Sequence, residues 1–118
     1  MKKNGKVNFV DINNVFVGFD YESSCCERFG YCITDKIPTR DIMYISDTQQ
    51  DLESYIFDTE YCQYIYDSKD SDLEAVAFKL VSEGKPDLFL ILYNSHNGYY
   101  SHGFQMKMNE HLLYGDSL

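Results

Sequence analysis

The chain has 118 residues and a formal net charge of −9, and 44% of its residues are hydrophobic and 16% aromatic. This length and apolar content allow one modest core, so we expect a single domain over residues 1–118. The negative charge argues against direct binding to nucleic acid or to anionic membranes, which both attract positively charged proteins. A basic protein partner is compatible with it.

The start of the chain has no apolar segment typical of a signal peptide. The longest apolar run, Leu88 to Tyr93, is too short to cross a membrane. The four cysteines include the adjacent pair Cys25 and Cys26, a pattern that does not suit a disulfide scaffold because neighbouring cysteines pair only with strain. We therefore expect a reducing, cytoplasmic location.

The first part of the chain predicts two strands and a short helix. Val7 to Ile12 and Val15 to Tyr21 alternate as strands around Asn13-Asn14, a two-residue turn because Asn tolerates the left-handed backbone region. Ser24 to Glu27 matches a capping box, which predicts a helix of about one or two turns. The run from Tyr31 to Thr34 suits a strand.

The middle of the chain predicts further strands. Residues 52–57 and 61–66 look like a strand pair around Asp58 to Glu60. Glu74 to Ser82 alternates as a strand, with a helix as the alternative. The turn signal Glu83 to Pro86 follows it.

The most informative segment follows the apolar run from Leu88 to Tyr93. Asn97-Gly98 is the strongest short-range signal of a β-hairpin, because a type I′ turn needs positive φ at both central residues. The alternating run Phe104 to Met108 would form the second strand. With a two-residue turn, Tyr93 would pair with His102.

Together these elements predict a mostly β domain, with an α+β layer as the alternative. We expect a single antiparallel sheet or a small barrel-like domain with one or two short helices. Residues 109–118 are expected to form a weakly ordered tail.

Polar side chains at the end of the predicted hairpin give one candidate binding site. Asn94, His96, Tyr99 and Ser101 would share a face of the hairpin and form a small hydrogen-bonding cluster. The alternative is a polar turn that contacts only solvent.

Cysteine and histidine residues give a candidate metal or small-ligand site, formed by Cys25, Cys26, His96 and His102. The same residues permit a Cys–His enzyme, in which a helix start lowers the pKa of Cys25 or Cys26 and His96 or His102 acts as the base. The alternative is that the cysteines pack as small hydrophobic residues. We expect no organic cofactor.

Eight acidic residues lie between Asp51 and Glu74 with tyrosines interleaved among them, and Lys69 is the only basic residue in this segment. A tyrosine is a rigid contact residue and negative charge speeds association with a basic surface, so this segment predicts docking on a basic protein. The alternative is a solvated strand pair and loop. The candidate binding residues are Asp58, Glu60, Tyr61, Tyr64, Tyr66, Asp67, Asp70 and Asp72.

Two motifs, Cys25-Cys26-Glu27 and Asn97-Gly98-Tyr99-Tyr100-Ser101, resemble a family of small uncharacterised bacterial and bacteriophage proteins. Its members carry a Cys-Cys-Glu element near the first strands and a Ser-Asn-Gly-Tyr-Tyr-Ser hairpin near the C-terminus. This chain differs in having His96 before the Asn-Gly pair. The resemblance implies a bacterial, phage or prophage setting and a shared fold, but no activity.

The sequence therefore predicts a small acidic protein-binding module rather than an enzyme. In its sharper form, the protein is a phage-type inhibitor or modulator of a basic, nucleic-acid-handling host protein. The alternatives are the metal or small-ligand site and the Cys–His enzyme. A homodimer formed through an exposed sheet edge is compatible with all three.

Overall fold

The structure is a computed structural model that describes residues 2–3, 7–19, 28–37, 52–66, 73–95 and 103–118. These residues form strands connected by turns, and they contain no helix. None of the described residues therefore belongs to a helix that is long and apolar enough to cross a bilayer. The strands are β1 (Lys2–Lys3), β2 (Val7–Val10), β3 (Val15–Phe19), β4 (Arg28–Thr34), β5 (Ile56–Tyr66), β6 (Leu73–Val81), β7 (Leu88–Ser95), β8 (Gly103–Met108) and β9 (His111–Ser117).

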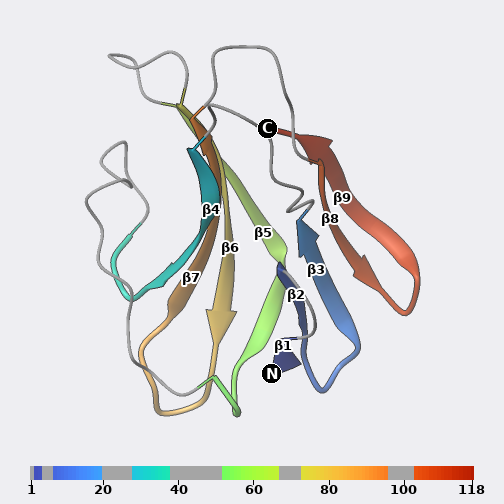
Figure 1. The fold of residues 1–118 in the computed structure, drawn as a ribbon. Helices are drawn as coiled ribbons and strands as arrows, with labels where there is room; N and C mark the ends of the chain where they lie inside the picture. Colours follow the sequence, from blue (N-terminus) through green and yellow to red (C-terminus); the bar gives the residue numbers. More distant parts are fainter. Residues whose placement is uncertain (1, 4–6, 20–27, 38–51, 67–72, 96–102) are drawn as a thin grey trace.

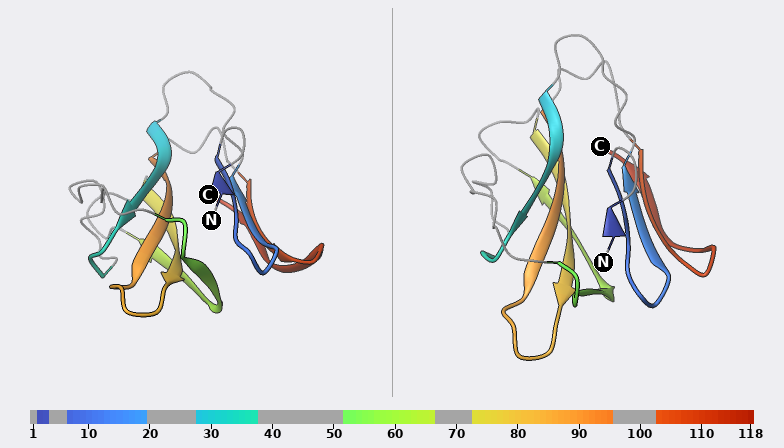
Figure 2. Two further views of the ribbon diagram at one scale, coloured as in Figure 1. Left: turned by 90° about the horizontal axis from the view of Figure 1, so that it is seen from below. Right: turned by 60° about the horizontal axis from the view of Figure 1, so that its bottom comes forward.

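The strands form two antiparallel sheets that face each other (Figures 1 and 2). The five-stranded sheet has the order β1-β2-β3-β8-β9, and the four-stranded sheet has the order β4-β7-β6-β5. The prediction of a mostly β, antiparallel protein is confirmed. The expected single sheet is replaced by two, and the helix expected from Ser24 to Glu27 lies outside the described residues.

The β2–β3 hairpin confirms the first predicted strand pair. Its turn is longer than the two residues expected: Asp11 N–H donates to the Val15 carbonyl at 3.1 Å, so residues 12–14 connect the strands. Asn14 has a φ of 60°, in the left-handed region that Asn tolerates. This is the geometry of a type I turn followed by one left-handed residue, the usual three-residue hairpin connection.

The predicted hairpin of residues 88–93 and 104–108 is wrong. Both segments are strands, but β7 lies between β4 and β6 in the four-stranded sheet, and β8 lies between β3 and β9 in the five-stranded sheet. Tyr93 pairs with Gly30 and Ala75 rather than with His102. Asn97-Gly98 lies outside the described residues.

The reason for this error is that β7 is buried on both faces. Leu90 faces the inside of the sandwich and Ile91 faces the opposite side, and neither is exposed. Such a strand needs a neighbour on each edge and cover on each face, which a simple two-stranded hairpin does not provide. A local turn signal carries no information about these long-range contacts.

The predicted strand pair at residues 52–57 and 61–66 is also wrong, because β5 is one continuous strand along β6. Phe57 pairs with Leu80 and Cys62 pairs with Phe78, so residues 58–61 lie opposite Lys79 alone. The polar residues that suggested a turn form a bulge in an edge strand. β6 confirms the predicted strand and excludes its helical alternative.

Residues 109–118 do not form the expected tail. Asn109 and Glu110 make a two-residue turn with φ values of 49° and 71°, and β9 then runs back along β8. The positive φ values are those of a type I′ turn. The sequence signal was weak because Glu rarely adopts positive φ. Leu118, after β9, is buried.

The main core lies between the sheets. It combines Phe9 and Val17 of the five-stranded sheet with Phe78 and Leu90 of the four-stranded sheet. The Phe78 ring meets Phe104 of the opposite sheet edge to face, with 6.0 Å between the ring centroids. A second apolar cluster covers the other face of the four-stranded sheet and consists of Cys32, Ile65, Ala75, Ala77, Phe89 and Ile91.

Candidate functional site

The tyrosines of the acidic segment do not share one surface. Tyr55 is fully buried. The Tyr61 ring packs on Phe89 of the second apolar cluster, at 5.7 Å between centroids. The Tyr64 ring points to the opposite face of β5 and packs on Phe104 in the main core, at 6.0 Å. All three rings therefore pack within the protein, Tyr55 and Tyr64 in the main core and Tyr61 on the outer face of the four-stranded sheet, which the sequence pattern did not indicate.

The acidic residues of this segment are more accessible where the structure describes them. Glu60 is exposed and Asp58 is half-buried in the β5 bulge. The Glu60 N–H donates to Asp58 Oδ1 at 3.0 Å, which fixes the shape of the bulge. Asp67, Asp70, Asp72 and the Tyr66 side chain lie outside the described part of the chain.

Among the described residues, polar contacts join the two sheets at Asp116, Asn94 and Asp11. The Tyr64 hydroxyl donates to Asp116 Oδ2 in β9 at 2.9 Å. A bond from the Ser117 N–H, and to a lesser degree the bond from Tyr64, lowers the pKa of the Asp116 carboxyl below its usual range. Asn94 Nδ2 donates to the Leu118 carbonyl at 3.0 Å. The third contact involves Asp11.

Asp11 also joins the two sheets, a role that the sequence pattern did not indicate. It is only 7% exposed. Its Oδ1 accepts the N–H groups of Asn13 and Val15, both at 2.9 Å, and its Oδ2 accepts the N–H of Phe57 in the opposite sheet at 2.8 Å. An Asp at the start of a turn is a known signal for the first two bonds, but the third is a long-range contact.

Asn94 is the one described member of the predicted hairpin cluster. Its side chain points into the sandwich and is fully buried. It bonds to the Leu118 carbonyl of the other sheet's C-terminal end and does not form part of an open polar face. His96, Tyr99 and Ser101 lie outside the described residues. The same applies to Cys25, Cys26 and His102, the candidates for a metal site and for a nucleophile.

The two described cysteines, Cys32 and Cys62, are not in a disulfide. Cys32 is buried in the second apolar cluster, and burial raises the pKa of the half-buried Cys62 thiol. Both suit the interpretation of cysteine as a small hydrophobic residue. Within the described segments, no group of three or more His, Cys, Asp or Glu side chains is arranged to hold a metal ion.

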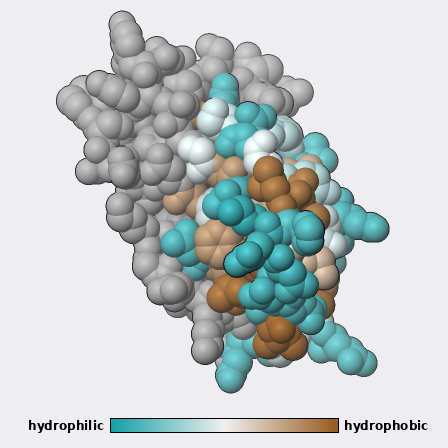
Figure 3. Space-filling model, turned by 90° about the vertical axis from the view of Figure 1, so that its right-hand side faces the viewer, coloured by the Kyte–Doolittle hydropathy of each residue, from teal (hydrophilic) through white to brown (hydrophobic). Residues whose placement is uncertain are grey.

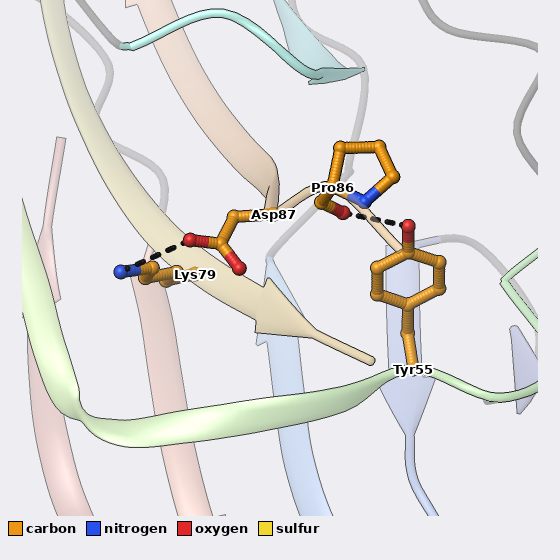
Figure 4. A network of polar contacts seen from close by, with 4 residues as sticks. All are labelled: Tyr55, Lys79, Pro86 and Asp87. Atoms are coloured by element: carbon orange, nitrogen blue, oxygen red, sulfur yellow. Dashed lines mark hydrogen bonds and ion pairs between the residues drawn. The ribbon is translucent and has the colours of Figure 1, made fainter. Parts of the chain in front are cut away.

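A polar network surrounds the turn between β6 and β7 (Figure 4). The Tyr55 hydroxyl donates to the Pro86 carbonyl at 2.7 Å, and Lys79 Nζ lies 3.4 Å from Asp87 Oδ2. Lys85 Nζ lies 5.8 Å from the centre of the Tyr55 ring. Burial is the main cause, and the Asp87 carboxylate a second cause, of a raised pKa for the Tyr55 hydroxyl.

Tyr55→Phe is expected to remove part of the alkaline sensitivity of the protein. An unfolded tyrosine ionises near pH 10, whereas the folded protein holds the Tyr55 proton to higher pH. This contribution to stability is complete below about pH 10 and is lost as the pH rises through the folded pKa. Urea unfolding at neutral pH and at about pH 11 measures it.

At neutral pH, Tyr55→Phe should cost about 0.5–1.5 kcal/mol for the lost hydrogen bond. Between the two pH values, its free energy of unfolding should fall less than that of the wild type. Tyr61→Phe, which removes the hydroxyl of a half-buried tyrosine, is the matched control. An equal fall in wild type and Tyr55→Phe would contradict the assignment.

A cavity of about 370 Å³ lies on the outer face of the five-stranded sheet. Gly18 forms its floor between Asn8 and Gln105, which lie beside it on β2 and β8. A Cβ atom on Gly18 would come within 2.7 Å of the Phe16 ring, so glycine leaves room for that ring on the sheet. None of the predicted binding residues lines the cavity.

The fold and these contacts define an acidic, antiparallel β-sandwich. No family model, no curated protein and no solved structure matches the chain.

Proposed function

We propose that this protein is a small acidic binding module whose partner is a basic protein. The observation that carries the proposal is the net charge of −9. Exposed carboxylates occur in both sheets and in their turns, at Asp35, Glu60, Glu83, Glu110 and Asp116. A field of one sign over a small surface attracts partners of the opposite charge and speeds their association.

The acidic segment from Asp51 to Glu74 is the proposed centre of contact. Glu60 is exposed on β5, which forms an edge of the four-stranded sheet. Asp67, Asp70 and Asp72 follow β5 directly in the sequence. In the sharper form of the proposal, the partner handles nucleic acid in a bacterial cytoplasm, and these carboxylates occupy its phosphate-binding surface.

Charge reversal tests the position of the contact. We expect Glu60→Lys combined with Asp67→Lys, Asp70→Lys and Asp72→Lys to abolish capture of the partner from a bacterial lysate. Asp58 is left unchanged because it accepts the Glu60 N–H in the bulge. Capture is compared by mass spectrometry, and thermal unfolding establishes that the variant is folded.

The control reverses the exposed carboxylates of Asp35, Glu83 and Glu110 together with Asp41, and all four residues lie outside the acidic segment. It produces the same net charge while leaving the segment around β5 acidic. Partner capture should survive in the control. If both variants capture the partner as the wild type does, the proposal fails; if the control alone loses it, the contact lies elsewhere than proposed.

A further inference from the structure

A row of alternating amide and glycine residues crosses the outer face of the five-stranded sheet. Its members lie directly opposite one another on β2, β3, β8 and β9 and are Asn8, Gly18, Gln105 and Gly115. We call these four residues the amide row. Residues directly opposite in an antiparallel pair share a face of the sheet, so both amide side chains project on the side of the cavity described above.

Two apolar side chains border the amide row. A Cβ atom on Gly18 would lie 2.7 Å from the Phe16 ring, so this ring leans over Gly18. A Cβ atom on Gly115 would lie 3.3 Å from Leu112, which leans over that glycine in the same way. Figure 3 shows this side of the molecule, where hydrophilic and apolar side chains lie next to one another. A ligand on the amide row would therefore meet polar and apolar groups together.

The two amides are available to such a ligand. Both side chains are half-buried, and neither has a hydrogen-bond partner within the described part of the chain. Polar groups in sheltered places are usually bonded, so two unbonded amides beside one cavity require an explanation. The strands of Asn8 and Gln105 are about 10 Å apart with the strand of Gly18 between them, so one ligand over Gly18 can bond to both amides.

The volume of the cavity suits a small molecule. It measures about 370 Å³. Small-molecule sites are usually clefts of about 300–1,000 Å³ that combine apolar surface with a few polar groups. The cavity and its two amides have this composition.

The charges on the protein favour a neutral ligand. None of the described residues that line the cavity is ionisable, so a cationic ligand would find no carboxylate there. The net charge of −9 repels anionic ligands such as nucleotides and acidic sugars. Lys107 lies opposite Phe16 on the same face, but it is a single positive charge.

We propose that the amide row binds a neutral saccharide. A sugar hydroxyl both donates and accepts hydrogen bonds, and so does each carboxamide, which makes Asn8 and Gln105 suitable partners for neighbouring hydroxyls. The C–H groups on the face of a sugar ring are apolar and would pack on Phe16. Gly18 keeps the floor open because it has no side chain. The proposal does not rest on the basic partner, which binds elsewhere.

Nuclear magnetic resonance of the ¹⁵N-labelled whole chain tests the proposal. The probes are glucose, galactose, N-acetylglucosamine, maltose, cellobiose and lactose, each at roughly 10 mM, a concentration that populates complexes with a Kd of about 10 mM or tighter. We expect at least one of these sugars to shift the backbone N–H signal of Gly18 and the side-chain NH₂ signals of Asn8 and Gln105.

Variants test the role of the amides. Gln105→Met keeps the length of the side chain but removes its donor and acceptor, so it should weaken sugar binding by roughly three- to tenfold. Asn8→Ala should weaken it by a similar factor. Gln63→Met, the same replacement at an exposed glutamine of β5 in the other sheet, should leave binding unchanged. The same spectra establish that each variant is folded.

Three results would overturn the proposal. The first is that none of the six sugars shifts these signals. The second is that Gln105→Met and Asn8→Ala both bind the sugar as the wild type does. The third is that adenosine monophosphate or trialanine, tested at the same concentration, shifts the signals of the amide row while the sugars do not, which would assign the cavity to another class of ligand.

Discussion

Asp11→Asn is expected to lower the free energy of unfolding by about 1–3 kcal/mol, because it leaves a buried backbone N–H facing a second donor. The carboxylate accepts three N–H groups, two in the β2–β3 turn and one from Phe57 in the opposite sheet. An amide side chain has one oxygen and can satisfy only one side of this arrangement. Asp11→Ala removes all three bonds and should cost more.

Urea unfolding measures the change, and amide hydrogen exchange locates it. If the one oxygen of the new amide side chain stays on the turn, the Phe57 amide should exchange faster while Val15 stays protected. Asp58→Asn is the control: that carboxylate accepts a single backbone N–H, which the one oxygen of an Asn side chain can also accept, so we expect a change of about 0.5 kcal/mol or less. If Asp11→Asn and Asp58→Asn were equally stable, the conclusion that the Asp11 carboxylate joins the two sheets would be wrong.

Leu90→Ala and Ile91→Ala are each expected to cost about 2–5 kcal/mol, the usual range for truncating a fully buried aliphatic side chain. These neighbouring residues point to opposite faces of β7, and both have no exposed area. Both losses should be large only if both faces of the strand are covered. Urea unfolding at equilibrium gives the two values.

Ile12→Ala is the control for these variants, since Ile12 is 83% exposed and its truncation should change stability by about 0.5 kcal/mol or less. A hairpin with one buried face would give a different result. In that case only one of Leu90→Ala and Ile91→Ala would be strongly destabilising, and the placement of β7 in the middle of a sheet would be wrong.

The sequence predicted strands well where the evidence is local. Alternation identified β3, with Val15 and Val17 on the buried face, and Asn14 marked the turn before it. Beyond the β2–β3 hairpin, the sequence did not predict which strands pair. The place of β7 between β4 and β6 depends on burial of both its faces. One of the two neighbours of β8, the strand β3, lies far away in the sequence. These choices follow from packing between distant segments, which periodicity does not encode.

The candidate site was likewise predicted only in part. Acid-rich composition pointed to Glu60, which the structure places at the surface. Tyrosine content suggested contact residues, but Tyr55 and Tyr64 bond within the protein, to Pro86 and Asp116. A tyrosine has both an apolar ring and a polar hydroxyl, so its sequence position alone does not separate a surface anchor from a core residue.

The measurement that tests the proposed function most directly is affinity capture from a bacterial lysate at roughly 0.1 M and roughly 1 M salt, between which the Debye length falls from about 10 to about 3 Å. A protein with a net charge of −9 that docks by charge should retain a basic partner at the lower salt and lose it at the higher. The amounts are compared by mass spectrometry. Capture of no basic protein at low salt, or of a partner retained equally at both salt concentrations, would contradict the proposal.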